Sequence, residues 1–350
     1  MTPNAKSIAG ARSTSSLYGA IAHHVSMAAK LIITTALALT PLTALLVLGW
    51  IVRLMRRETV IACVRHAHSC SRAQAVDRLG AIDRLEVYSR FPGWWSGLWQ
   101  TVLGGLRAFI VLVMLTLPFG ALLLLSWWAG WENSFNKGYE QAWAGPAVAL
   151  VGILLTVAIL SHLPMAMARF AAEGSLWSVL ELRQVRRLIR AVRWRYLALT
   201  IVTVLTTAPL FLAQIAPTFM EKINPKVLTA DPEELRAIAE RWHLMATIYA
   251  LVVLFFLRRW AARLYARAVL AEPDAAGPFV RETVSAIGLD TSDAEAPRRH
   301  WTGMVMATLL GCVAWGGFIV MLYIAQFANH AWWNWVNHPL IGLPWVFRPI

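Results

Sequence analysis

The chain has 350 residues, of which 58% are hydrophobic and only 15% are charged, and its formal net charge is +13. Soluble globular domains carry about 25% charged residues, so this composition excludes that class and indicates an integral membrane protein. Nucleic acid is also excluded as the expected partner, because the basic residues occur in the loops between apolar runs and do not gather in one soluble segment.

The first 99 residues predict a tail, a membrane span and a polar segment. Residues 1–26 are rich in Ser, Ala and Thr and predict a loosely ordered tail or a short interfacial helix. Residues 31–52 predict a first span kinked at Pro41, since a helix of this length matches a hydrocarbon core of about 30 Å. Residues 56–99 mix arginine with acidic residues and predict a cytoplasmic helical segment.

Five further spans are predicted, which gives a six-span membrane domain over residues 27–327. They lie near residues 108–128, 146–168, 197–219, 242–260 and 302–327. The fifth has an uncharged core of only about 21 Å, so we expect it inside one long helix from Pro232 to about Leu270 with Asp231 as N-cap. Residues 328–350, rich in tryptophan and proline, predict an interfacial tail.

The distribution of arginine predicts the orientation of the chain. Seven arginines occur after each of the first, third and fifth spans, whereas the loops after the second and fourth contain one and four basic residues. Under the positive-inside rule, the arginine-rich loops are cytoplasmic and both termini lie outside. The sequence therefore predicts an all-α polytopic bundle of about six spans, with basic amphipathic cytoplasmic helices, in the inner (plasma) membrane of a bacterial cell.

Residues 169–196 form the most distinctive of the arginine-rich segments. From Leu182 to Tyr196, apolar residues fall on one helical face, and the other face carries Arg183, Arg186, Arg187, Arg190 and Arg193. We expect this helix to lie along the inner membrane surface and its arginines to bind anionic lipid headgroups or an acidic partner. Charge reversal at Arg186, Arg187 and Arg190 is expected to weaken that association. A genome that favours arginine codons explains the preference for arginine over lysine equally well.

Apart from Gln326 at the end of the sixth span, His162 and Gln214 are the strongly polar residues in the apolar cores, and these two are candidate intramembrane sites. Haem ligation or proton relay would be functional roles for His162, because ionisable groups at membrane depth often mark function. However, no Asp or Glu occurs in the six apolar cores. This favours an interhelical hydrogen bond for His162 and disfavours a proton- or sodium-coupled transporter. Gly104-Gly105 and Gly316-Gly317 are sites where helices can approach closely.

A short cysteine and histidine pattern, C-x2-H-x-H-x-C, follows the first span. It consists of Cys63, His66, His68 and Cys70. On a helix, residues 63, 66 and 70 share a face, which makes them weak candidates for a metal site, but the spacing matches no zinc module, and we predict no metal or other cofactor. Walker A, HExxH, GxSxG and CxxCH motifs do not occur, so no enzymatic activity is expected.

The middle of the chain contains a tryptophan-rich motif FPGWWSGLWQ, the motif GGLRAF, and the stretch LPMAMARFAAEGSLWSVLELRQVRRLIR followed by Tyr196. Through these motifs, residues 91–214 resemble an uncharacterised family of prokaryotic multi-pass membrane domains, classed as a domain of unknown function. The family usually has an aromatic residue followed by Asp before its basic helix, where this sequence has Leu180-Glu181. The resemblance implies a topology and supplies no activity.

Two functions from different classes remain open. A non-enzymatic scaffold or accessory subunit, packed against other membrane proteins or a second copy of itself, fits the uncharged cores, the interfacial tryptophans and the arginine helix. A permease or lipid-handling transporter component fits six spans that contain prolines. A polar mid-membrane cavity lined by His162 or Gln214 would favour transport, and a dry bundle with an exposed apolar flank would favour a scaffold.

Overall fold

The computed structural model describes residues 29–81, 94–128, 143–215, 230–286 and 301–328, which form helices and short connections without a strand. The predicted N-terminal tail and the tryptophan-rich C-terminal tail lie outside the described residues. Four helices are long and apolar enough to cross a membrane, and a bent helix pair would make a fifth crossing. These four are α4 (Trp94–Trp127), α9 (Arg193–Ile215), α11 (Pro232–Ala271) and α13 (Trp301–Ala328).

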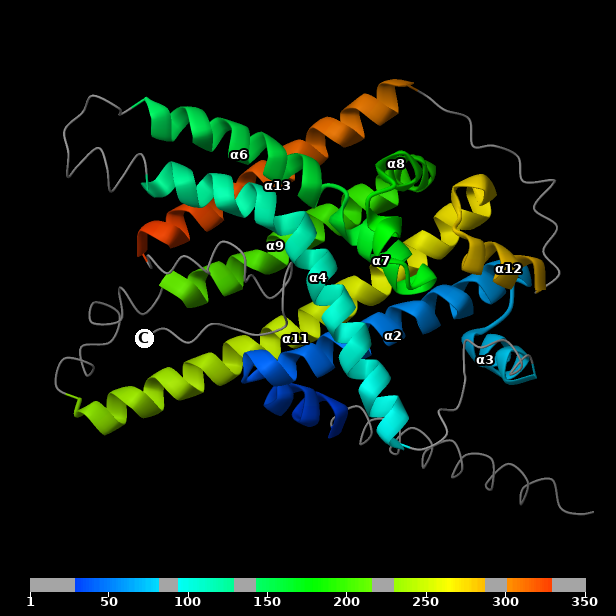
Figure 1. Ribbon diagram of the computed structural model, residues 1–350, viewed down its shortest axis with the longest axis horizontal. Helices are drawn as coiled ribbons and strands as arrows, with labels where there is room; N and C mark the ends of the chain where they lie inside the picture. Colours follow the sequence, from blue (N-terminus) through cyan, green and yellow to red (C-terminus); the bar gives the residue numbers. More distant parts are fainter. Residues whose placement is uncertain (1–28, 82–93, 129–142, 216–229, 287–300, 329–350) are drawn as a thin grey trace, which may run out of the picture.

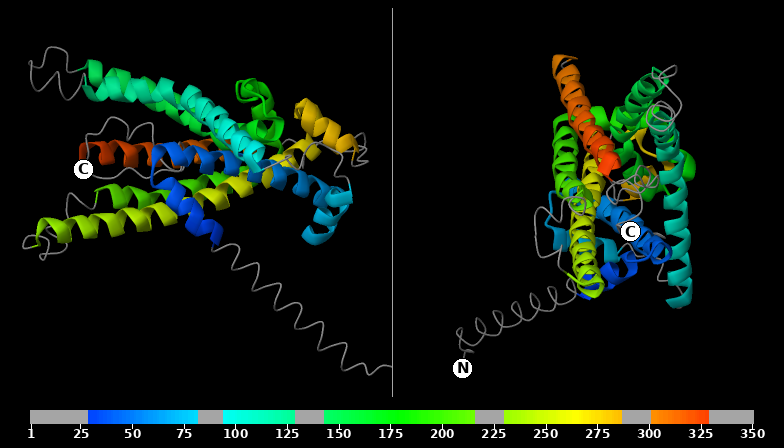
Figure 2. Two further views of the ribbon diagram at one scale, coloured as in Figure 1. Left: turned by 60° about the horizontal axis from the view of Figure 1, so that its bottom comes forward. Right: turned by 90° about the vertical axis from the view of Figure 1, so that its left-hand side faces the viewer.

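The long helices pack side by side in a bundle, and most of them lie roughly along the longest axis of the molecule (Figures 1 and 2). Helix α2 (Pro41–Ala67) packs against α4 and α11, and α13 packs against α9 and α6 (Ala144–Leu160). The short helices α3 (Arg72–Ala81), α8 (Leu182–Ala191) and α12 (Pro278–Ala286) gather at the right-hand end of Figure 1. We call this end, residues 53–81, 163–196 and 257–286, the arginine cap, because all three arginine-rich stretches contribute to it.

The first predicted span is wrong as a single kinked helix. The helix Ala29–Ala38 ends before Thr40, and α2 begins at Pro41. Thr40 caps α2, because its side chain accepts a hydrogen bond from the Thr43 backbone N–H. Proline is favoured in a first helical turn, where its missing N–H is not needed, so Pro41 starts a helix here and does not bend one.

The third predicted span is divided in the same way. Helix α6 ends at Leu160, α7 (Leu163–Glu173) follows after Ser161-His162, and the two helices are bent by 46°. Pro164 lies in the first turn of α7, which again places a proline at a helix start. The residues of α7 from Leu163 to Ala172 are almost all buried, so α7 lies in the core of the arginine cap.

Helix α11 confirms the prediction of one long helix around the fifth span. It runs from Pro232 to Ala271 over 40 residues, and the Asp231 side chain accepts a hydrogen bond from the Glu234 backbone N–H at 2.7 Å. One end of α11 is therefore remote from the arginine cap, and the other end supplies the cap with four of its arginines, Arg258, Arg259, Arg263 and Arg267.

The helix predicted from Leu182 to Tyr196 is interrupted. Helix α8 ends at Ala191, Val192 is its C-cap, and Arg193 begins α9. The apolar side chains Val185 and Leu188 are fully buried in the core of the protein, where α8 contacts α7 and α11. Most of the apolar side of α8 is therefore covered by its own chain, although Leu182 is 44% exposed. A membrane surface is not needed to bury Val185 and Leu188, and the location of α8 along that surface stays a prediction.

Helices α2 and α4 cross at two glycines. A Cβ atom on Gly49 would lie 1.9 Å from the Thr101 carbonyl oxygen, and one on Gly105 would lie 2.0 Å from the Leu45 carbonyl oxygen. Arg53 Nη2 also donates to the Gly97 carbonyl oxygen at 2.7 Å. Gly105 is therefore a close-approach site as expected, whereas a Cβ on Gly316 or Gly317 would meet no atom within 4 Å.

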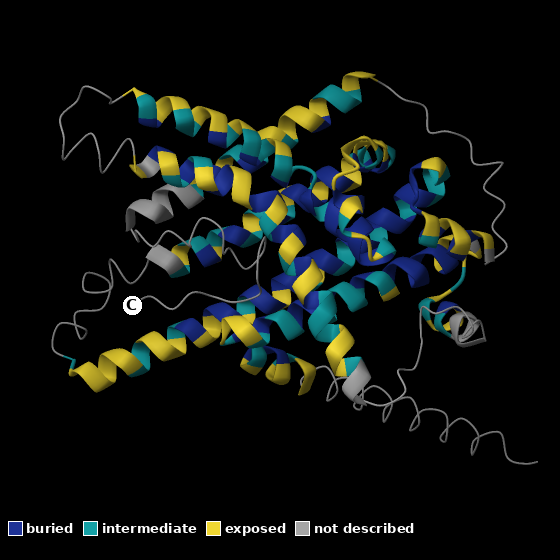
Figure 3. Cartoon of the chain, viewed as in Figure 1, coloured by how far each residue is buried: buried dark blue, intermediate teal, exposed yellow. Residues whose placement is uncertain are grey.

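Exposed residues follow the outer faces of the bundle (Figure 3), and many of them are large and apolar. Leu150 and Leu154 on α6 are 60% and 63% exposed, and Leu309 and Val313 on α13 are 56% and 73% exposed. Contiguous apolar surface of this kind is unfavourable in water and is typical of lipid-facing or subunit-facing helices.

Candidate functional site

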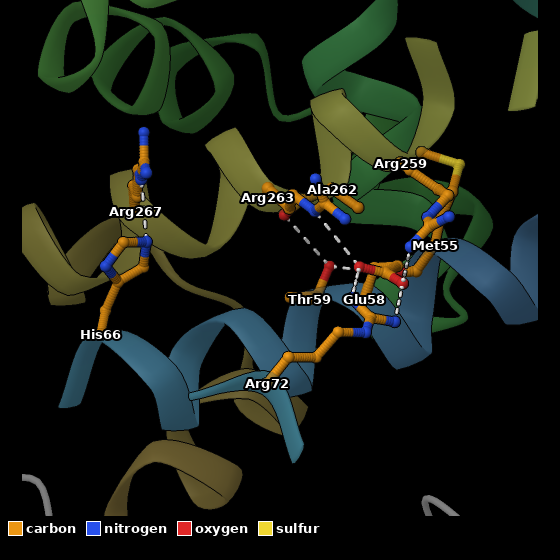
Figure 4. Close-up of polar contacts among 9 residues, drawn as sticks. All are labelled: Met55, Glu58, Thr59, His66, Arg72, Arg259, Ala262, Arg263 and Arg267. Carbon is orange, nitrogen blue, oxygen red and sulfur yellow. Dashed lines mark hydrogen bonds and ion pairs between the residues drawn. The ribbon is translucent and has the colours of Figure 1, made fainter. Parts of the chain in front are cut away.

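Glu58 is the centre of an ion-pair cluster in the arginine cap (Figure 4). Its side chain is only 1% exposed and lies on α2 among arginines from α3 and α11. Arg72 Nη1 is 2.9 Å from Glu58 Oε2, Arg259 Nη2 is 2.9 Å from Oε1, and Arg263 Nε is 3.3 Å from Oε2. One carboxylate thus connects α2 with α3, which follows it in the sequence, and with Arg259 of α11, which lies 201 residues away.

The charges around Glu58 decide its protonation. Burial by itself raises the pKa of this carboxyl, but the hydrogen bond from Arg72 and the charges of Arg259 and Arg263 outweigh burial and lower the pKa to about 2. Glu58 is therefore ionised throughout the physiological range. Three guanidinium groups face one carboxylate, so the cluster retains an excess of positive charge, and its arginine side chains are 34% to 43% exposed.

His66 forms a second contact between α2 and α11. Arg267 Nε donates to His66 Nε2 at 2.8 Å, so His66 is neutral with its proton on Nδ1 (Figure 4). Partial burial, followed by the positive charges of Arg267, Arg65 and Arg195, lowers the pKa of His66 below its ordinary value. The charged groups that act on His66 are therefore all arginines, and no carboxylate is among them.

The structure separates the weak metal candidates. Helix α2 ends at Ala67 and Ser69 has a positive φ of 45°, so Cys70 leaves the helical face that Cys63 and His66 were expected to share. Cys63 is buried, and burial raises its pKa to about 12. Within the described residues, no group of three or more His, Cys, Asp or Glu side chains could hold a metal ion.

Glu173 is a second internal carboxylate, at the end of α7. Its two oxygens accept hydrogen bonds from the backbone N–H groups of Phe279 and Val280 at 3.0 and 3.3 Å. These groups belong to the first turn of α12, where a carboxylate is favoured by the helix dipole. A Cβ atom on Gly277 would lie 2.2 Å from the Glu173 carboxyl carbon, so the absence of a side chain at Gly277 makes room for this cap.

A third carboxylate, Glu181, pairs with Arg169. The Arg169 side chain is 4% exposed and Glu181 is 52% exposed, and Arg169 Nη2 donates to Glu181 Oε2 at 2.5 Å. Glu58, Glu173 and Glu181 are thus all engaged in contacts within the cap.

His162 lies at the break between α6 and α7, beside the arginine helix α8. Arg186 Nε donates to His162 Nε2 at 3.3 Å, and His162 Nδ1 donates to the Ala158 carbonyl oxygen at 2.6 Å. The expected hydrogen bond from another helix is therefore present, but it comes from the cap and not from a neighbour at mid-membrane. The side chain of Gln214 lies outside the described part of the structure.

The five arginines predicted to bind lipid or a partner are divided into two sets. Arg183, Arg186, Arg187 and Arg190 are exposed on α8, and none of them pairs with an acidic side chain in the described part of the chain. Arg186 and Arg190, together with Arg193 at the start of α9, line a groove. Arg183 and Arg187 are not part of that lining.

The groove lies between α8, α9 and α13 and has a volume of 460 Å³. Its arginines and His162 lie at one end, and its walls continue along Leu197 of α9 and along α13 from Met304 to Trp315. A pocket of this size is in the range of ligand sites. The cavity is therefore basic at one end and apolar along its length, which is neither the polar mid-membrane cavity expected of a transporter nor a dry bundle.

Sequence reasoning missed Glu58, Glu173 and the groove. Glu58 gave one signal, as a lone acid directly after Arg56-Arg57 at the end of an apolar run. Glu173 gave another, since it precedes Gly174, a typical helix end, while Gly277-Pro278 marks a helix start. The walls of the groove come from segments more than 100 residues apart, and no local pattern indicates that they meet.

Comparison with known proteins gives no further assignment. No protein-family model, no curated protein and no solved structure shows a significant match to this chain.

Proposed function

We propose that this protein is a non-enzymatic scaffold or accessory subunit of a membrane complex, and that its arginine cap docks an acidic partner. The observation that supports this proposal is the contrast within the cap. Three of its carboxylates, Glu58, Glu173 and Glu181, are engaged in contacts within the cap, and Asp274 and Glu282 are exposed. By contrast, Arg183 and Arg187 project from α8 without an acidic partner in the described residues. Exposed arginines on a helix whose apolar side is packed against the protein are suited to carboxylate or phosphate groups.

We infer six membrane crossings. They comprise the four apolar helices, helix α6 with the bend that leads into α7 at the cap, and the segment formed by Ala29–Ala38 with the first half of α2. The clustering of the arginine-rich stretches at one end supports a cytoplasmic cap in a bacterial inner membrane, with both termini outside. A reporter fused at Ile350 should be active only outside the cytoplasm, and activity only inside it would overturn this topology.

The scaffold role is tested by native purification from membranes. The Arg183→Gln/Arg187→Gln variant should lose chains that co-purify with the wild-type protein, whereas Arg241→Gln should retain them. Arg241 is a matched control because it is an exposed arginine at the opposite end of α11. Recovery of the wild-type protein only as a free monomer, or equal loss in both variants, would contradict the proposal.

Lipid handling is the second candidate function, and the groove favours it over a solute permease. The groove is bounded by α13, the least buried of the four apolar helices, and lies beside its exposed face. Membership of the uncharacterised membrane-domain family remains a prediction that adds no activity to either candidate.

A further inference from the structure

The groove between α8, α9 and α13 has a basic end and an apolar wall, and a single amphiphilic molecule could contact both. Arg186, Arg190 and Arg193 line its end at the arginine cap. Arginine binds phosphate oxygens through parallel N–H groups and is more weakly hydrated than lysine, which suits it to an interfacial phosphate. The three arginines therefore make this end of the groove basic, although Glu272 lies with Arg190 and Arg193 in an adjoining hollow.

Helix α9 also contributes residues to the basic end. Helix α9 begins at Arg193, and its first-turn residues Arg193 and Tyr196 both line the groove. The Arg193 guanidinium is held against α13, because a Cβ atom on Gly303 would lie 2.9 Å from Arg193 Nη1. The basic end is thus built from α8, α9 and α13 together.

The rest of the groove is apolar in character. Its hydroxyl groups are turned to their own helices, since Thr200 Oγ1 donates to the Tyr196 carbonyl and Thr308 Oγ1 donates to the Met304 carbonyl. From Met304 to Trp315 the wall follows α13 for roughly 16 Å, at about 1.5 Å per residue. Leu197, Ala307 and Leu309 line this length. An acyl chain fits such a wall, and a free phosphate ion would leave it empty.

We propose that this groove is a binding site for one anionic phospholipid, with its headgroup phosphate at Arg186, Arg190 and Arg193 and an acyl chain along α9 and α13. Charge complementarity at one end and the apolar wall beside the exposed face of α13 select a membrane lipid as the occupant. The inference rests on the membrane location of the chain and not on the scaffold role, which uses Arg183 and Arg187.

The test is native mass spectrometry of the delipidated full-length protein titrated with phosphatidylglycerol or phosphatidylcholine. The wild-type protein should bind one phosphatidylglycerol at least tenfold more tightly than phosphatidylcholine. Arg186→Gln/Arg190→Gln should weaken phosphatidylglycerol binding about tenfold or more, because two charge-assisted contacts are lost. Arg183→Gln/Arg187→Gln is the matched control, with the same change of charge on the same helix, and should bind normally.

A second pair of variants tests the apolar wall. Gly311 lines the groove, and a Cβ atom there would meet only Leu197 Cδ1 at 4.0 Å, so Gly311→Leu extends into the cavity without a backbone clash. It should weaken binding of both lipids. Gly317→Leu should have no effect, because Gly317 lies outside the groove, and a Cβ there meets no atom within 4 Å.

Three results would overturn the inference. One is equal weakening by the two arginine pairs, which would indicate general attraction by the cap. Another is normal binding in Gly311→Leu together with displacement of the lipid by inorganic phosphate, which would assign the arginines to a free anion. The third is an unchanged affinity of Arg186→Gln/Arg190→Gln for phosphatidylglycerol.

Arg186→Lys/Arg190→Lys is a further control. It keeps the positive charge that sets the orientation of the chain in the membrane, and it should bind phosphatidylglycerol with intermediate affinity. This variant separates a loss of lipid binding from a wrong insertion into the membrane.

Discussion

Glu58 and Glu173 are carboxylates inside the arginine cap, but different kinds of donor satisfy them. Glu58 receives three charged side chains from α3 and α11, whereas Glu173 receives two uncharged backbone N–H groups from α12. Contacts at Glu58 depend on ionic charge and connect distant helices. Contacts at Glu173 depend on the space beside Gly277 and position one short helix. The cap thus uses one carboxylate to hold its long helices together and another to attach its edge.

The largest effect is expected from Glu58→Gln. The amide removes the charge that three arginines face and places an N–H₂ group among them, which should lower the free energy of unfolding by about 3 kcal/mol. The thermal midpoint of the purified protein, followed by tryptophan fluorescence, measures this loss. Glu240→Gln is the control, because Glu240 forms only an exposed pair with Arg236. A midpoint equal to that of the control would show that the cluster does not hold the cap together.

An effect of about 1 to 2 kcal/mol is expected when the Glu173 cap is removed. Gly277→Ala places a Cβ atom where the carboxyl group lies, so the two hydrogen bonds to α12 should be lost. Hydrogen exchange should then increase in α12 and remain unchanged in α11. Faster exchange throughout both helices would mean that Glu173 holds the whole cap, as Glu58 does, and would remove the distinction between them.

The contact between His66 and Arg267 should give a smaller, pH-dependent effect. The pKa of His66 is below its ordinary value, so the unfolded chain binds a proton at this site more readily than the folded protein. Stability from this contact is therefore present above about pH 6.5 and is lost as the pH falls through the folded pKa.

His66→Gln tests that dependence, since the glutamine oxygen can still accept from Arg267 but does not titrate. The decrease in thermal midpoint between pH 7.5 and 5 should be smaller in this variant. The corresponding difference in the free energy of unfolding should be below about 1 kcal/mol, because His66 is exposed. Identical pH profiles for the variant and the wild-type protein would exclude His66 as a titrating contact.

The smallest effect is expected at Glu181. Glu181→Gln breaks an ion pair whose acidic partner is 52% exposed, so the loss should be about 0.5 kcal/mol. Arg169→Gln should cost more, because the Arg169 side chain is 4% exposed and lies in the core of α7. If the two substitutions were equal in thermal midpoint, burial of Arg169 would contribute nothing beyond the pair.

Local features of the fold could be predicted from the sequence, and contacts between distant segments could not. Asp231-Pro232 specifies the start of α11 through its own side chain and ring, so that prediction is confirmed. Pro41 and Pro164 carried the same information, but the surrounding apolar runs predicted continuous spans and obscured the breaks. The partners of Glu58 on α11 lie more than 200 residues away, which no periodicity indicates.

The arginine helix shows the same limit within the candidate site. Its periodicity identifies Val185 and Leu188 as the buried face, but burial by a membrane and burial by α7 and α11 give the same pattern. The pattern also groups Arg186 and Arg190 with Arg183 and Arg187. Only the position of α13 divides them into groove and outer surface.

The crossing of α2 and α4 affects how sequence variants of this protein should be interpreted. Alanine is usually the mildest replacement for glycine in a helix, and it even improves helix propensity. At Gly49 and Gly105 a single methyl group would overlap a carbonyl oxygen of the partner helix, so the two backbones would have to separate. At these two positions the smallest possible substitution is therefore expected to be harmful, whereas at Gly316 and Gly317 of α13 a Cβ atom meets no atom within 4 Å and larger side chains are expected to be accommodated.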